Sequence, residues 1–119
     1  MGEREKFEDI ESWRKARKLV GDLYRVTGRF SKDYSLRDQI RRAGMSIMLN
    51  IAGGFGRQPD REFAQFLFIA LASVAEIQSA LYVALDHKYV EETSFRNLYN
   101  QCSEVARLIS GFIKYLRKT

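Results

Sequence analysis

Residues 63–85 read FAQFLFIALASVAEIQSALYVAL, and this stretch decides the fold. Eighteen of its 23 positions are apolar. The five polar positions are Gln65, Ser73, Glu76, Gln78 and Ser79. With no proline or glycine to interrupt it, the stretch predicts a helix over about residues 60–87 that is apolar almost all round. Such a helix must be covered on most of its sides, which requires other helices to pack against it.

Three further helices are predicted from apolar residues that recur at steps of three and four. They span about residues 7–28, 35–55 and 94–117. Their apolar stripes include Ile10, Trp13, Ala16, Val20 and Leu23 in the first, Leu36, Ile40, Ala43 and Ile47 in the second, and Phe95, Leu98, Cys102, Val105 and Ile109 in the last. No stretch alternates as a strand does. Residues 1–119 are therefore predicted to form one all-α domain, an antiparallel up-down-up-down four-helix bundle with short connections.

The helix boundaries follow from residues that cap helices. Ser35, with Asp38 three residues later, predicts the N-terminus of the second helix. Pro59 and Asp60 suit the first turn of the third helix, since proline has no N–H to lose there and an acid favours the dipole. Thr93 or Ser94 is expected to cap the last helix.

The helix over residues 60–87 has more apolar surface than a four-helix bundle can cover, because each helix of a bundle keeps an outward face. The surplus predicts an interface between copies of the chain. Its candidate residues are Phe66, Phe68, Ile69, Ala72, Tyr82 and Val83.

The chain carries a formal charge of +5, and all of it lies in the first half. Residues 1–61 hold 14 basic and 9 acidic residues, whereas residues 62–119 hold 6 of each. This asymmetry favours an anionic partner, RNA or DNA, bound through phosphate charge and shape because no base-reading motif is present. The candidate binding residues are Arg14, Arg17, Lys18, Arg41, Arg42, Arg57 and Arg61. The alternative is that these side chains form an ordinary solvated face.

Enzyme chemistry is not expected. Cys102 and His87 are the only cysteine and histidine, so no disulfide can form within the chain and a metal site or thiol catalyst is disfavoured. No pair of carboxylates shares a recognisable site, and no cofactor or small-molecule substrate is expected. The longest apolar run, residues 66–72, is far shorter than the ~20 residues that span a bilayer. With a charged N-terminus, the chain is expected to be cytoplasmic and to have no membrane partner.

Residues 45–57, MSIMLNIAGGFGR, combine a polar Asn50 with a glycine-rich helix end. A buried Asn50 needs partners, so it either fixes helix register through a neighbouring backbone group or contacts a ligand. Gly53 and Gly54 predict either a frayed end or a close approach of two helices. The run follows a helix, whereas a dinucleotide-binding glycine loop follows a strand, so nucleotide binding there is not expected.

Several short motifs together resemble the four-helix bundle proteins encoded within intervening sequences of bacterial large-subunit ribosomal RNA genes. They are FEDI at 7–10 with Trp13 and Ala16, QIRRA at 39–43, Ser46-Ile47 with NIA at 50–52, GFGR at 54–57, Glu62-Phe63 with Phe66-Leu67, and ISGFI at 109–113. The family motif residues are thus Asn50, Gly54, Phe55 and Gly56. The chain has Met48 and Gly53 where the family usually has a proline and an acid.

The resemblance implies a homo-oligomer. This family is similar to the accessory variability protein of diversity-generating retroelements, a pentameric barrel of four-helix bundles that is thought to bind nucleic acid. By that likeness the chain is expected to form a homopentamer with a basic surface. The competing hypothesis is a protein-interaction or scaffold module whose charge only keeps it soluble.

Overall fold

The computed structural model describes residues 6–57 and 59–118, and over these residues it is all-helical, with no strand. A short 3₁₀ turn, η1 (Phe7–Asp9), precedes four α-helices. The helices are α1 (Glu11–Thr27), α2 (Tyr34–Phe55), α3 (Asp60–Asp86) and α4 (Glu92–Arg117). The predicted all-α class and the predicted number of long helices are confirmed.

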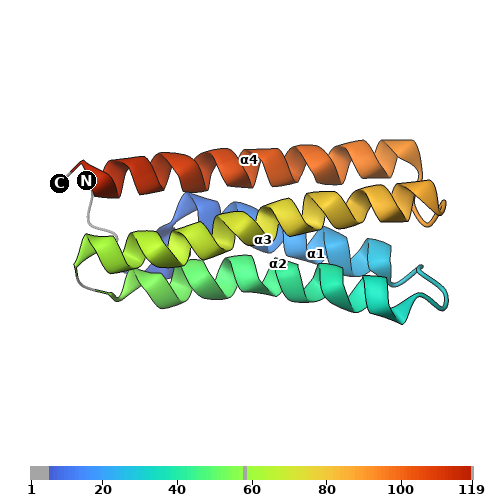
Figure 1. The fold of residues 1–119 in the computed structure, drawn as a ribbon, viewed down its shortest axis with the longest axis horizontal. Coiled ribbons are helices and arrows are strands. Elements are labelled where there is room, and N and C mark those ends of the chain that lie inside the picture. Colours follow the sequence, from blue (N-terminus) through green and yellow to red (C-terminus); the bar gives the residue numbers. More distant parts are fainter. Residues whose placement is uncertain (1–5, 58, 119) are drawn as a thin grey trace.

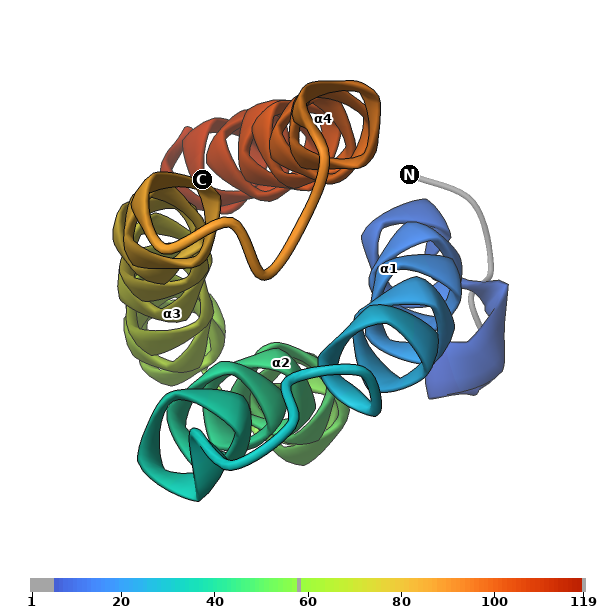
Figure 2. The same cartoon turned by 90° about the vertical axis from the view of Figure 1, so that its right-hand side faces the viewer.

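The helices lie side by side along an elongated body of 46 × 21 × 19 Å (Figure 1). Each helix ends at the end of the body where the next one begins. Viewed down the long axis, α1, α2, α3 and α4 follow one another around a square (Figure 2). α2 therefore packs against α1 and α3, and α4 packs against α3 and α1. One end of the body holds the α1–α2 and α3–α4 connections, and the other holds the α2–α3 connection with the end of α4 (Figure 1).

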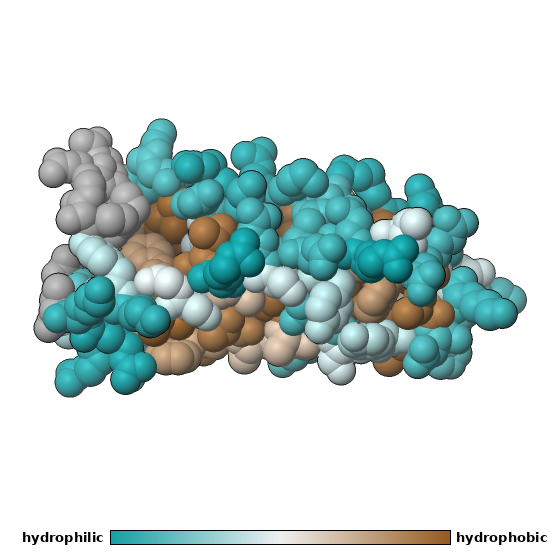
Figure 3. Space-filling view, turned by 90° about the horizontal axis from the view of Figure 1, so that it is seen from above, coloured by the Kyte–Doolittle hydropathy of each residue, from teal (hydrophilic) through white to brown (hydrophobic). Residues whose placement is uncertain are grey.

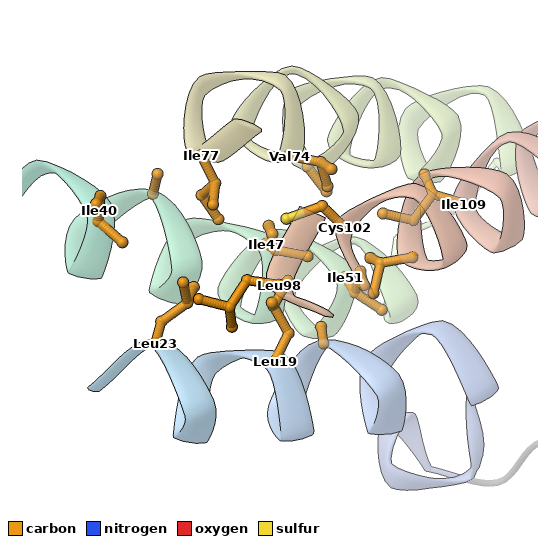
Figure 4. Close-up of a cluster of buried hydrophobic side chains, with 14 of the residues drawn as sticks. Leu19, Leu23, Ile40, Ile47, Ile51, Val74, Ile77, Leu98, Cys102 and Ile109 are labelled. Carbon is orange, nitrogen blue, oxygen red and sulfur yellow. The ribbon is translucent and has the colours of Figure 1, made fainter. Parts of the chain in front are cut away.

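The core fills the centre of the square with aliphatic side chains from all four helices (Figure 4). Leu19, Ile47, Ile77 and Leu98 are among the fully buried residues. Cys102 lies in the same cluster, and burial raises the pKa of its thiol to about 12. The position of Cys102 on the buried apolar stripe of its helix is confirmed, and a buried thiol that stays protonated is a poor nucleophile.

α3 keeps its predicted extent to within one residue and supplies nine buried residues to the bundle. By length and composition it is also apolar enough to cross a membrane, although 33% of its most apolar window is buried inside this bundle. Four of its large apolar residues stay exposed, as the predicted surplus requires: Phe68, Ile69, Tyr82 and Val83.

Three predicted helix starts were wrong. The first α-helix begins at Glu11, because Phe7–Asp9 form a separate 3₁₀ turn and Ile10 is extended. Asp33, not Ser35, caps α2: its carboxylate accepts a hydrogen bond from the Leu36 N–H at 3.1 Å.

The third wrong start is that of α4. It begins at Glu92 after Glu91, so neither Thr93 nor Ser94 is its cap. Pro59 lies at the N-cap of α3, one position before the helix.

Gly54 lies where α2 and α3 pack closely against each other. A Cβ added there would lie 2.6 Å from the Cβ of Phe66 and 2.8 Å from Cδ1 of Phe63. The neighbouring Gly53 is exposed, and its added Cβ would lie 3.6 Å from Phe66, an ordinary contact. α2 continues through both glycines, so close helix approach, not fraying, explains Gly54.

We expect Gly54→Ala to destabilise the bundle by about 1–3 kcal/mol, since the extra methyl must push two helices apart. Gly53→Ala is the matched control and should be neutral or stabilising by up to about 1 kcal/mol, because alanine favours the helix. Urea denaturation followed by circular dichroism measures both. Equal effects of the two substitutions would contradict the close-approach interpretation.

Candidate nucleic-acid interface

α1 and α2 carry most of the positive charge of the bundle, with eight basic and three acidic residues between them. α3, on the other side of α2, has one basic and four acidic residues. Arg14, Lys18 and Arg25 are exposed and follow one another along the solvent side of α1. Arg14 donates a hydrogen bond to the backbone oxygen of Glu8 at 3.1 Å, which leaves its charge at the surface.

Asp22 organises part of this row. Its carboxylate accepts hydrogen bonds from Lys18 at 3.0 Å, from Arg25, and from Gln101 of α4 at 2.8 Å. Burial alone would raise the pKa of Asp22, but the hydrogen bonds from Gln101, Lys18 and Arg25 outweigh it and hold that pKa below its ordinary value. Asp22 therefore stays ionised near neutral pH and fixes Lys18 and Arg25 in place while neutralising one of their two charges.

Arg41 has a structural contact that the sequence did not indicate. Its Nε donates to the hydroxyl of the buried Thr27 at 2.8 Å, and a terminal nitrogen donates to the Tyr24 carbonyl at 3.0 Å. Its guanidinium also lies 4.4 Å from the centre of the Tyr24 ring. Arg41 thus closes the last turn of α1, where free carbonyls favour a cation.

The structure separates the adjacent pair Arg41 and Arg42. Arg41 turns toward α1, whereas Arg42 is exposed and lines a groove between α2 and α3 that also contains Glu76. Arg17 lies over Trp13, with 6.0 Å between the guanidinium carbon and the ring centre. The candidate residues of α1 and α2 are therefore not all on one surface, because Arg41 and Arg42 face different neighbours.

Arg57 and Arg61 lie at the end of the bundle that holds the α2–α3 connection (Figure 1). Arg57 is exposed and its guanidinium carbon lies 5.2 Å from the centre of the Phe66 ring. Arg61 lines a hollow at the start of α3 together with Arg117 of α4. Arg117 was not among the predicted residues, because cations at a helix C-terminus are expected without any ligand.

The motif residues have structural roles. The amide of Asn50 donates to the Ser46 carbonyl at 2.8 Å and to its hydroxyl at 3.1 Å, and Ser73 of α3 donates to the same hydroxyl at 2.8 Å. Asn50 therefore belongs to a polar link between α2 and α3.

The last motif residues, Phe55 and Gly56, lie at the end of α2, next to the start of α3. Phe55 meets Phe63 edge-on at 6.3 Å between ring centres. Gly56 is the C-cap of α2 and has open space around it.

The six predicted interface residues lie on three different parts of the surface of α3. Phe66 packs over Gly53 and Gly54, and the exposed Tyr82 packs against Phe95 and Tyr99 of α4. Ile69, Ala72 and Val83 line the groove toward α2, and Phe68 lies toward α4. Ile69 is 52% and Val83 42% exposed. Figure 3 views the molecule from the side of α4, whose surface is mostly hydrophilic (teal). Hydrophobic side chains (brown) lie next to this surface, on the side where α3 lies.

No metal centre is found in the part of the chain that the structure describes, where no three His, Cys, Asp or Glu residues come together to bind an ion. The carboxylates Glu62 and Glu76 are both exposed, on different turns of α3. The arrangement that remains is a set of surface cations on helices whose positions are fixed by the bundle.

Comparison with known proteins places this chain in a family, and it also finds a solved structure with a similar helical fold. Residues 8–111 match the model of the family described as "23S rRNA-intervening sequence protein", and the chain belongs to this family. A solved structure from Bacteroides thetaiotaomicron, a protein of unknown function from the S23 ribosomal protein family, has a similar fold. Its TM-score is 0.80 at 22% sequence identity, over 87% of this chain and 98% of that one. No curated protein matches.

We expect Arg41→Gln to cost about 1–2 kcal/mol of stability, because it removes charged hydrogen bonds to Thr27 and Tyr24. Arg42→Gln is the matched control, one residue away and exposed, and should change stability by less than about 0.5 kcal/mol. Thermal or urea unfolding distinguishes them. If both variants unfold like the parent protein, the Arg41 contact contributes nothing to the fold.

Proposed function

We propose that this protein is a non-enzymatic, cytoplasmic homo-oligomer that binds structured RNA or DNA through the basic surface of α1 and α2. The observation that carries the proposal is the row of exposed cations on α1, which consists of Arg14, Lys18 and Arg25. α1 and α2 together have eight basic and three acidic residues. Phosphate backbones are the polyanions that such rows bind, largely without sequence preference. Membership of a family named for 23S rRNA intervening sequences supports RNA as the first partner to test.

Oligomerisation would strengthen weak phosphate contacts. The exposed Ile69 and Val83 of α3, with Met45 and Leu49 exposed on α2, supply the apolar surface for a subunit interface. Five subunits, as the family resemblance implies, would repeat the same basic row five times around a ring. Repeated contacts of one ligand then add by avidity.

The surface cations differ in how well they suit a test. Arg41 is unsuitable, since it holds Thr27 and Tyr24. Arg14 and Lys18 are exposed and their hydrogen bonds stay within η1 and α1, so the double variant Arg14→Glu, Lys18→Glu should fold. Arg96 of α4 is exposed and pairs only weakly with Glu92 at 4.0 Å, so Arg96→Glu is a control for a change of net charge.

We expect nuclease-treated protein to bind a structured RNA or a duplex DNA, and its affinity to fall by orders of magnitude between about 50 and 200 mM salt. The double variant should bind more weakly and with a shallower salt dependence, the slope falling by about one for each phosphate that is no longer neutralised. Fluorescence anisotropy measures both. Arg96→Glu should keep most of the affinity.

Absence of binding at low salt would overturn the proposal and favour the scaffold alternative. If the loss of binding free energy only follows the change in net charge, so that it is about twice as large in the double variant as in Arg96→Glu, net charge alone and no particular surface drives binding.

A further inference from the structure

Two adjoining hollows lie between the start of α3 and the end of α4. The larger has a volume of about 820 Å³ and is lined by Arg61, Gln65, Phe68 and Arg117, among others. The smaller, of about 440 Å³, is lined by Phe68, Ser110, Lys114, Arg117 and Lys118, among others. Phe68 and Arg117 line both, so they form the partition that the two hollows share.

Phe68 has the features of a stacking platform. Its side chain is 46% exposed, although it projects from a helix whose other phenylalanines are at least half-buried. The guanidinium carbon of Arg117 lies over the ring, 5.9 Å from its centre, so a cation adjoins the ring. The Phe68 ring lies toward α4, so it is separate from the groove that is lined by Ile69, Ala72 and Val83.

The charge around Phe68 is positive. Four cations line the two hollows: Arg61, Lys114, Arg117 and Lys118. Among the described lining residues the one carboxylate is Asp60, and Glu62 follows it in the first turn of α3. The cations thus exceed the nearby acids, and they come from two helices that are far apart in the sequence.

Other exposed aromatic residues differ from Phe68 in their surroundings. Tyr24 has the guanidinium of Arg41 at 4.4 Å, but Arg41 is held by the Thr27 hydroxyl and the Tyr24 carbonyl. Tyr115 also borders a hollow, but Asp9 and Glu11 line that hollow and would repel a phosphate. Tyr82 is packed among the rings of Phe95 and Tyr99. Tyr34, at the other end of the bundle, has the guanidinium of Arg37 at 4.8 Å, but Arg37 is paired with the Asp38 carboxylate at 3.0 Å.

We infer that this cleft, defined by Arg61, Phe68, Lys114, Arg117 and Lys118, binds unpaired nucleotides of a single-stranded nucleic acid. An unpaired base stacks on the Phe68 ring, and the flanking phosphates lie against the cations in the two hollows. An exposed aromatic ring bordered by cations is how proteins hold single strands without reading their sequence. A duplex keeps its bases stacked inside, so it cannot use the ring.

The inference rests on the proposed nucleic-acid binding and narrows it: the cleft takes single strands or loops, while the row on α1 takes any phosphate backbone. A structured RNA with an unpaired loop would use both surfaces.

The test compares three DNA probes of equal length, about ten nucleotides: an oligothymidylate, an abasic strand with the same phosphates, and a duplex. The variants are Phe68→Leu, which removes the ring but keeps an apolar side chain, and Arg117→Gln. Tyr34→Leu is the matched control, because it also removes an exposed ring beside an arginine. Circular dichroism and the molecular mass of each variant confirm that fold and assembly are unchanged.

We expect the unmodified protein to bind oligothymidylate more tightly than the abasic strand. Phe68→Leu should weaken oligothymidylate binding by roughly 5- to 150-fold, the loss of one stacked base, and leave the abasic strand unaffected. Arg117→Gln should weaken both strands and reduce the salt slope by about one. Tyr34→Leu should change nothing.

Equal affinity for the thymidylate and abasic strands, or a Phe68→Leu loss that is the same for both, would overturn the inference. If the duplex is still bound with a steep salt dependence that Arg14→Glu, Lys18→Glu reduces, the proposed function stands without this cleft. If no probe is bound at low salt, both fail.

Discussion

The structure depends on one constraint, the burial of α3. Its residues are apolar on almost every side, so it is stable in water only where other helices cover it. α2 covers one flank, where Gly54 allows the backbones to approach, and α4 covers the other. Along the groove beside α2, Ile69, Ala72 and Val83 stay exposed. The apolar residues of α3 therefore form much of the core and also leave an apolar surface that is unfavourable in water unless another protein surface covers it.

The basic residues lie mainly on helices other than the apolar α3. The acids outnumber the basic residues on α3, and the basic residues lie mainly on α1, on α2 and at the end of α4. Some of these cations stabilise the fold, as Arg41 does on the last turn of α1. Others, such as Arg14 and Arg42, are exposed and remain available to phosphate. Only the structure distinguishes the cations that stabilise the fold from those that are merely exposed, because the sequence shows both kinds as basic residues on helices.

The sequence predicted the helical class, the extent of α3 and the burial of Cys102, since each follows from periodicity and composition over many residues. It misplaced helix starts because a cap depends on one side chain, and Asp33 competes with Ser35 only two positions away. It named both Arg41 and Arg42 as candidate binding residues, but adjacent side chains on a helix point about 100° apart, and only the packing of α1 shows that Arg41 has a structural contact. It also could not bring Arg117 beside Phe68, since that contact depends on how α3 and α4 pack.

The most direct test of this account is the mass of the unmodified protein in solution, measured by light scattering or sedimentation over a range of micromolar concentrations. If the exposed apolar surface of α3 is covered by another copy of the chain, the mass is a fixed multiple of 13.9 kDa and does not change across that range. A mass of 13.9 kDa at every concentration would contradict it, because α3 would then keep Ile69, Ala72 and Val83 in water.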